Sequence, residues 1–189
     1  MILLPVLSIV LLQACSNSIK EKEKTVPVNE KEAFFPVSSY LKGQIVEIIQ
    51  KGVNPIKYTT VKGHTDSIWL KTEEFNEAFK EFLHPEIDSV NLTAMFSEKK
   101  FMDRSIDAFT FTYDPIGKLP DSMTLSHWDV YVDPTTENVK RIYMLKNISP
   151  NKTLQLTWQS NKWCKLTTIV DLPDGTSFIE KEEKITWDF

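Results

Sequence analysis

The sequence predicts an α+β domain in which two N-terminal helices pack on a curved antiparallel meander sheet of about six strands. Two observations support this fold class. Apolar residues recur at helical spacing in the first part of the domain, and after Phe101 they alternate with polar residues, as in half-buried strands. The links between the predicted strands are short, so successive strands should be antiparallel neighbours.

Composition indicates one globular domain with an N-terminal appendage. Of the 189 residues, 41% are hydrophobic and 25% are charged, which excludes a disordered or collagen-like chain. The 22 basic and 26 acidic side chains give a net charge of −4, which argues against a broad nucleic-acid-binding face. The sequence has no Walker loop, no H-E-x-x-H and no C-x-x-C motif. We therefore expect no nucleic-acid partner, no cofactor and no metal.

The first 14 residues read as a signal peptide. Residues 1–12 are apolar and uncharged, yet too few for a spanning helix, which needs about 20 residues. The sequence Leu-Gln-Ala-Cys that ends at Cys15 resembles the lipobox of bacterial lipoproteins. The resemblance implies that Cys15 receives a diacylglycerol, that residues 1–14 are removed and that the new amino terminus is acylated, which gives a stable membrane anchor. The alternative is a buried apolar strand with an incidental cysteine.

Residues 15–33 are interpreted as the lipidated cysteine and a flexible tether. Residues 16–33 contain four lysines and four glutamates and hardly any apolar side chains, so the segment cannot bury enough surface to fold by itself. The α+β domain then spans residues 34–189. If Cys15 carries lipid, Cys164 has no partner for an intramolecular disulfide.

Two helices are expected at the start of this domain. The first lies within residues 34–52, where Ser38 or Ser39 can cap it and Gly52 can end it. The second begins at a capping Thr72 and ends at His84-Pro85. Its apolar stripe consists of Phe75, Ala78, Phe79, Phe82 and Leu83. Between the helices, the chain could form a hairpin around Gly63.

The remainder of the domain predicts six strands. They span residues 106–113, 123–132, 139–146, 153–159, 162–170 and 178–189. Turn signals separate them at Asp133-Pro134, Ser160-Asn161 and Asp174-Gly175. In the second of these strands the apolar alternation changes phase, which predicts a β-bulge near Ser126-His127.

Several segments resemble small uncharacterised lipoproteins of Bacteroidetes. These are FFPV at the start of the domain, YTTV, DSIWLKTEEF, FTFTYDP and the closing ITWDF, which lie across most of residues 34–189. The resemblance implies attachment to the cell envelope, on the periplasmic or surface side of the outer membrane. It implies no activity.

Tryptophan residues are the best candidates for ligand binding, because tryptophan is common at interfaces and in stacking platforms. The candidates are Trp128, Trp158 and Trp163, of which the last two flank a tight turn. The alternative is that these side chains fill the core beneath the helices.

A cysteine–histidine dyad is the candidate enzyme site. Cys164 and His127 lie on predicted strands of one sheet, and Asp129 could orient the imidazole. A nucleophilic cysteine needs an exposed, electropositive setting, whereas Cys164 follows Trp163 in a predicted core strand. We therefore expect a protein that is not an enzyme.

Three Asp-Ser-aliphatic triplets resemble the acceptor motif of O-glycosylation in Bacteroidetes. They begin at Asp66, Asp88 and Asp121, and the resemblance implies glycans on Ser67, Ser89 and Ser122. The alternative is that these Asp-Ser pairs serve only as turn and cap residues.

Together these observations predict a lipid-anchored cell-envelope protein whose function is binding. One hypothesis is a site for a hydrophobic or lipid-like ligand on the concave side of the sheet, which a cavity lined by Phe and Leu would favour. The other is a protein–protein interaction subunit of an envelope assembly, which a filled core and an exposed apolar patch would favour. A cleft joining His127 to Cys164 would favour a hydrolase.

Overall fold

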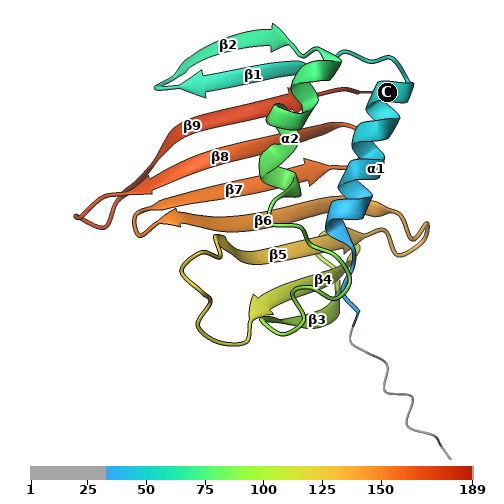
Figure 1. Ribbon diagram of the computed structural model, residues 1–189, viewed down its shortest axis with the longest axis vertical. Coiled ribbons are helices and arrows are strands. Elements are labelled where there is room, and N and C mark those ends of the chain that lie inside the picture. Colours follow the sequence, from blue (N-terminus) through green and yellow to red (C-terminus); the bar gives the residue numbers. More distant parts are fainter. Residues whose placement is uncertain (1–32, 189) are drawn as a thin grey trace, which may run out of the picture. The chain divides into compact units, whose positions relative to one another are not determined.

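The computed structural model describes residues 33–188, which form one antiparallel sheet with two helices on one of its faces (Figure 1). The helices are α1 (Val37–Gln50) and α2 (Phe75–Leu83), and a 3-10 turn at Thr72–Glu74 leads into α2. The strands are β1 (Ile56–Val61), β2 (His64–Trp69), β3 (Phe96–Asp103), β4 (Ala108–Pro115), β5 (Leu125–Val132), β6 (Val139–Ser149), β7 (Lys152–Gln159), β8 (Trp163–Asp171) and β9 (Ser177–Thr186). The predicted signal peptide, the candidate lipidation site Cys15 and the predicted tether as far as residue 32 lie outside the described residues.

The strands are arranged in the order β2-β1-β9-β8-β7-β6-β5-β4-β3. Strands β3 to β9 follow one another as a meander, and the β1–β2 hairpin joins the sheet beside β9. In the hairpin, Lys62 and Gly63 both have positive φ, +50° and +82°, as a two-residue turn of type I′ requires. The two edges of the sheet are therefore β2 and β3.

The predicted fold class is wrong. The chain is mainly β, with nine strands in one sheet where about six were expected, and its helices have only 14 and 9 residues. The helices are not an N-terminal pair, because α2 follows the β1–β2 hairpin. The prediction missed β3 and gave the hairpin no place in the sheet. The cause is the side-chain pattern, since every residue of β2 is exposed and the middle of β3 is the charged run Glu98-Lys99-Lys100.

The six predicted strands are confirmed as β4 to β9, close to their expected bounds. The bulge is also confirmed, as the pairing of β5 with β6 shifts register between Leu125 and His127. The helix starts differ from the prediction. No side chain caps α1. Instead, the buried Ser38 hydroxyl accepts a hydrogen bond from the backbone amide of Ile87 at 2.8 Å, which ties α1 to the segment that follows α2.

Aromatic side chains fill the core between the sheet and the helices. Phe79 and Phe82, on one face of α2, contact the Trp158 ring at centroid distances of 5.4 and 5.3 Å. Farther along the sheet, Tyr113 stacks on Trp128 at 4.5 Å. Trp128 and Trp158 are both 0% exposed. The core is therefore closed by edge-to-face and stacked aromatic contacts.

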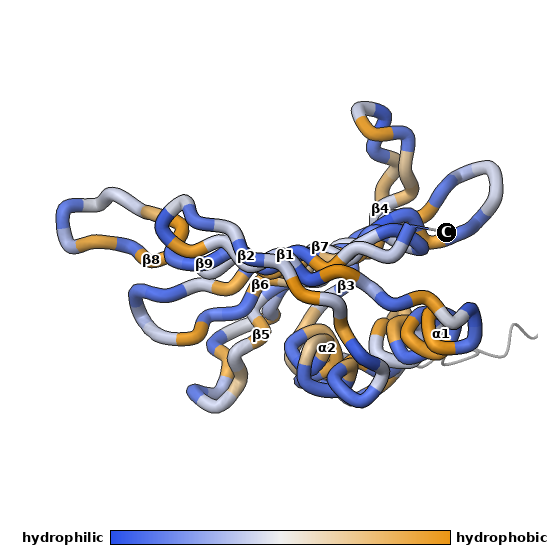
Figure 2. Tube along the Cα trace, turned by 90° about the horizontal axis from the view of Figure 1, so that it is seen from above, coloured by the Kyte–Doolittle hydropathy of each residue, from blue (hydrophilic) through white to orange (hydrophobic). Residues whose placement is uncertain are grey.

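The two faces of the sheet have different surroundings. Seen edge-on, both helices lie on the same side (Figure 2). Residues that alternate onto that side, the helix face, include Ile142, Trp158, Cys164 and Ile185, which pair directly across β6 to β9. No described helix covers the other side, which we call the open face. Its central rows consist of Tyr131, Arg141, Gln159, Trp163 and Thr186, and of Asp129, Tyr143, Thr157, Lys165 and Lys184.

Candidate functional site

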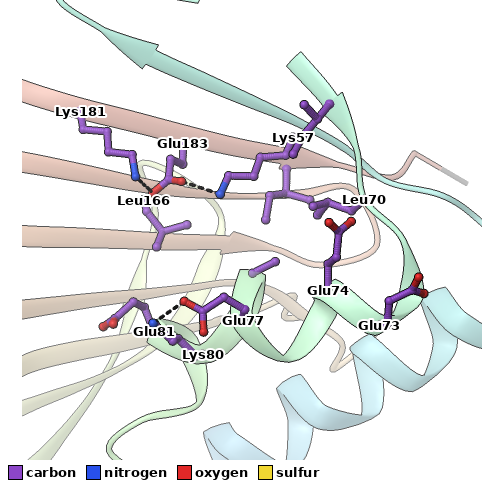
Figure 3. A pocket seen from close by; sticks show the side chains of 13 residues that line it. Lys57, Leu70, Glu73, Glu74, Glu77, Lys80, Glu81, Leu166, Lys181 and Glu183 are labelled. Carbon is purple, nitrogen blue, oxygen red and sulfur yellow. Dashed lines mark hydrogen bonds and ion pairs between the residues drawn. The ribbon is translucent and has the colours of Figure 1, made fainter. Parts of the chain in front are cut away.

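A groove lies between α2 and the part of the helix face formed by β1, β8 and β9 (Figure 3). Its volume is about 640 Å³. It forms because the β1–β2 hairpin extends the sheet beyond the strands that α2 packs against. We call it the α2 groove. Its lining residues are Lys57, Ile68, Leu70, Glu73, Glu74, Glu77, Ala78, Lys80, Glu81, Leu166, Lys181, Glu183 and Ile185.

The floor of the α2 groove is apolar. Leu70, Leu166 and Ile185 are buried, and Ala78 of α2 is partly buried. Ile68 of the edge strand β2 lies at the margin and is 55% exposed. The floor thus continues from the core to an apolar side chain that is largely open to solvent.

One wall of the groove is an ion-pair triplet on the sheet. The Glu183 carboxylate lies 2.6 Å from the Lys57 ammonium and 2.9 Å from that of Lys181. Burial by itself would raise the pKa of Glu183, but the hydrogen bonds from the two lysines outweigh it and lower the pKa below its ordinary value. Glu183 is therefore ionised at neutral pH, and this wall carries charge in fixed positions.

The opposite wall is formed by glutamates of the 3-10 turn Thr72–Glu74 and of α2. Glu77 pairs with Lys80 on the same helix, and Glu81 pairs with Lys146 of β6 at 2.8 Å. Among the described residues, Glu73 and Glu74 have no ion-pair partner, although the Glu74 carboxylate accepts a hydrogen bond from the Lys71 backbone amide. Five carboxylates and three ammonium groups line the groove, so its net charge is negative.

A second cluster of titratable groups lies on the open face. His127 Nδ1 is 2.9 Å from a carboxylate oxygen of Asp114, and His127 Nε2 is 3.2 Å from one of Asp129. Asp129 also accepts hydrogen bonds from the hydroxyls of Thr112 and Tyr131, at 2.7 and 2.9 Å. Because both ring nitrogens face carboxylates, the arrangement fits a doubly protonated imidazolium.

The pKa values in this cluster shift accordingly. The hydrogen bond with Asp129 raises the pKa of His127 above 6.5 against the opposing effect of burial, and Asp114 adds to the rise. Burial would raise the pKa of Asp129, but its hydrogen bonds to His127, Thr112 and Tyr131 lower it below 3.8. The cluster is therefore a network of ionised groups, in which the two carboxylates balance the charge of the imidazolium and accept its hydrogen bonds.

The structure brings His127 and Asp129 together but places Cys164 elsewhere. Cys164 is 0% exposed on the helix face of β8, whereas the other two side chains project from the open face. Burial raises the pKa of the Cys164 thiol well above its ordinary value. The predicted dyad is therefore not assembled, because strand alternation sends its two members to opposite sides of the sheet.

The candidate tryptophans occupy two environments. Trp128 and Trp158 lie in the core, the alternative location that the sequence allowed, where their indole nitrogens have no hydrogen-bond partner among the described residues. Trp163 is half-buried on the open face, and the Lys184 ammonium lies 5.4 Å from the centre of its ring. Only Trp163 of the three reaches the surface without movement of the helices.

The three candidate glycosylation sites differ in exposure. Ser67 is exposed within the edge strand β2, and Ser122 is exposed in the turn before β5. Ser89 is half-buried, and its carbonyl accepts a hydrogen bond from the Phe34 amide at 2.9 Å. Space for a glycan is thus greatest at Ser67 and Ser122.

Sequence reasoning missed the α2 groove. The helical spacing predicts the apolar stripe of the second helix, but it does not indicate that Glu73, Glu74, Glu77 and Glu81 border a groove. The groove exists because β1 pairs with β9, and no local pattern in the sequence indicates that pairing. Among residues 33–188, no group of three or more His, Cys, Asp or Glu side chains is arranged to hold a metal ion, and neither helix is long and apolar enough to cross a membrane.

Comparison with known proteins adds no assignment. No family model matches the chain, and no curated protein or solved structure matches it either.

Proposed function

We propose that this chain is a lipid-anchored cell-envelope protein that acts as a protein-binding module, with the α2 groove as its docking site. The observation that carries the proposal is an open groove between two charged walls, whose apolar floor continues from the core to the exposed Ile68 side chain at its margin. Such a surface, apolar at the centre and polar at the rim, is the usual composition of a protein interface.

The groove suits a protein segment better than a free lipid-like ligand. A carrier for a hydrophobic molecule encloses its ligand in an apolar cavity. Here the space beneath the helices is filled by packed aromatic rings. The groove is bounded by five carboxylates and three ammonium groups, which an acyl chain would desolvate without replacing their hydrogen bonds.

The edge strand beside the groove supports the same conclusion. Sheet edges that avoid pairing usually carry charges. The edge strand β3 has Glu98, Lys99 and Lys100 in succession, whereas β2 has Asp66 as its only acidic or basic residue apart from His64. Next to the groove, β2 exposes Ile68, at 55%, and its neighbour Trp69, which points to the open face, is 67% exposed. This edge therefore lacks the protection that β3 has.

The negative charge of the groove defines the partner. Glu73 and Glu74, in the 3-10 turn that leads into α2, have no cationic partner among the described residues. A segment with apolar side chains for the floor and lysine or arginine for this wall would complement both features. The lipid on Cys15 would hold the groove near other proteins of the envelope, and the tether of residues 16–33 would allow it to reach them.

Site-specific photocrosslinking in cells tests the proposal. A photoreactive phenylalanine analogue is placed at Ile68, beside the groove, and at Val46, an apolar α1 residue that is 48% exposed. We expect one discrete crosslinked partner from position 68 and none from position 46. The crosslink should weaken when Glu73→Gln and Glu74→Gln are combined. Equal crosslinking from both positions, or a crosslink indifferent to the double substitution, would contradict the proposal.

A further inference from the structure

The open face carries two cations that have no carboxylate within ion-pair distance among the described residues. The Arg141 guanidinium lies over the Tyr131 ring, 4.3 Å from its centre, and the Lys184 ammonium lies 5.4 Å from the centre of the Trp163 ring. The carboxylates in the neighbouring rows are already paired. Asp114 contacts Lys99, Asp129 contacts His127, and Glu182 contacts Lys165, at 3.0, 3.2 and 3.3 Å.

Arg141 has the geometry of an anion-binding group. It is one of two arginines in the chain, and it lies on the central strand β6. Stacking on Tyr131 holds the plane of its guanidinium, and an oriented guanidinium binds a carboxylate through two parallel hydrogen bonds. Asp103, at the end of β3, is hydrogen-bonded to Ser105 and acts on Arg141 only at longer range.

Two shallow hollows adjoin Arg141 and share it as a lining residue. One has a volume of about 250 Å³ and the other about 150 Å³. The first is lined by Asp129, Tyr131, Arg141, Tyr143 and Thr157, and the second by Ile106, Ala108, Tyr131, Lys140, Arg141 and Gln159. A ligand bound at the guanidinium therefore has room on both sides of it.

Uncharged polar groups lie between the two cations. The hydroxyls of Tyr143 and Thr157 have no hydrogen-bond partner among the described residues. Burial raises the pKa of Tyr143, so its hydroxyl remains a donor. The Gln159 amide nitrogen donates to the Lys140 carbonyl, which leaves the amide oxygen as an acceptor. Arg141 and Lys184 lie on strands that are three positions apart, about 14 Å across the sheet at the usual strand spacing, and they are offset by two residues along the strands.

We propose that the open face binds a linear acidic oligosaccharide. One carboxylate of the sugar chain binds Arg141, a second carboxylate lies at Lys184, and the sugar hydroxyls between them bond to Tyr143, Thr157 and Gln159. This site is independent of the α2 groove, which lies on the opposite face of the sheet.

The chemistry of the face favours an acidic sugar over a single-stranded nucleic acid. Bases bind chiefly by stacking on open aromatic rings, whereas the rings of Tyr131 and Trp163 are each covered by a cation. Hydroxyl and amide groups between the cations match a ligand rich in hydroxyls.

Calorimetric titration of the full-length protein in detergent tests the site. The ligands are hexagalacturonate, neutral maltohexaose and an oligothymidylate of similar length. We expect hexagalacturonate to bind, with an affinity that falls as salt is added, and the other two not to bind. No binding of hexagalacturonate, equal binding of maltohexaose, or tighter binding of the oligothymidylate would overturn the proposal.

Matched variants locate the binding. Arg141→Gln should weaken hexagalacturonate binding about tenfold or more, because two charge-assisted hydrogen bonds are lost. Arg141→Lys keeps the positive charge but lacks the two parallel N–H donors of the guanidinium, and it should recover only part of the affinity. Arg104→Gln, which changes the other arginine in the exposed β3–β4 turn, should leave the affinity unchanged. Circular dichroism of each variant shows that it is folded. Folded Arg141→Gln protein with wild-type affinity would disprove the assignment.

Discussion

Lys146 of β6 and Glu81 of α2 form an ion pair that joins the sheet to the second helix. The ammonium nitrogen lies 2.8 Å from a Glu81 carboxylate oxygen and also donates to the Glu81 backbone carbonyl. Their exposures differ greatly, since the Lys146 side chain is 2% exposed and that of Glu81 is 37% exposed. The pair therefore consists of a buried cation that depends on a partly solvated anion.

This asymmetry predicts unequal effects of the two substitutions. Glu81→Ala leaves a buried ammonium without its carboxylate and should lower the free energy of unfolding by about 2 kcal/mol or more. Lys146→Met keeps most of the packing volume, removes the buried charge and should cost about 1 kcal/mol. Urea unfolding measures both, with Lys80→Met on the exposed side of α2 as a control that should change stability by less than about 0.5 kcal/mol. A larger loss from Lys146→Met would contradict this account.

The network of His127, Asp114 and Asp129 predicts a pH dependence of stability. The folded-state pKa of His127 is raised above 6.5, so its contribution is complete below pH 6.5 and is lost as pH rises through the folded pKa. The pKa values of Asp114 and Asp129 are lowered below 3.8, so their contribution is present above that value and is lost as pH falls through the folded pKa values.

His127→Gln should accordingly flatten the decline of stability on the alkaline side of pH 6.5. Thermal unfolding across the pH range measures this, and an NMR titration of the imidazole gives the pKa directly. His64→Gln, on the exposed edge strand β2, is the matched control and should leave the profile unchanged. A wild-type profile in the His127 variant would show that the network contributes nothing.

The buried thiol of Cys164 should be inert in the folded protein. Its side chain is fully buried and its pKa is raised by that burial, so little reactive thiolate forms and the reagent cannot reach it. We expect Ellman's reagent to modify Cys164 only under conditions that unfold the domain. Fast modification in native buffer would show that the helix layer opens readily.

The lipid anchor is tested at Cys15. Cys15→Ala should move the protein from the membrane fraction to the soluble fraction and abolish incorporation of labelled palmitate, because no thiol remains to accept the diacylglycerol. Cys164→Ala changes the other cysteine and should leave both readouts unchanged. Palmitate labelling that persists in the Cys15 variant would disprove the anchor.

The sequence predicts those parts of the fold that are set by local patterns. Alternation between polar and apolar residues locates β4 to β9, and the change of phase at Ser126-His127 locates the bulge. It does not reveal that Lys57 pairs with Ile185, because nothing in either strand encodes its distant neighbour. That pairing extends the sheet, creates the α2 groove and changes the fold class.

The same limit applies to the candidate sites. Period-two alternation does place His127 and Asp129 on one face of β5, as expected from their spacing. Cys164 could contact His127 and Asp129 only if its side chain lay on the same face of the sheet. The pairing of β8 with β7 instead places this side chain on the helix face, in the core. Similarly, the sequence marks Trp163 as an interface-prone residue, but only the three-dimensional pairing shows that it lies with Arg141 on the face without helices.

The pairing of β1 with β9 also determines the order in which the strands of the sheet can pair during synthesis. The β1–β2 hairpin is synthesised early, yet its neighbour in the sheet is the last strand to emerge from the ribosome. Contacts between such distant segments form late and slowly. A nascent chain therefore cannot complete its sheet before β9 has been synthesised, so the β1–β2 hairpin has no strand to pair with until then.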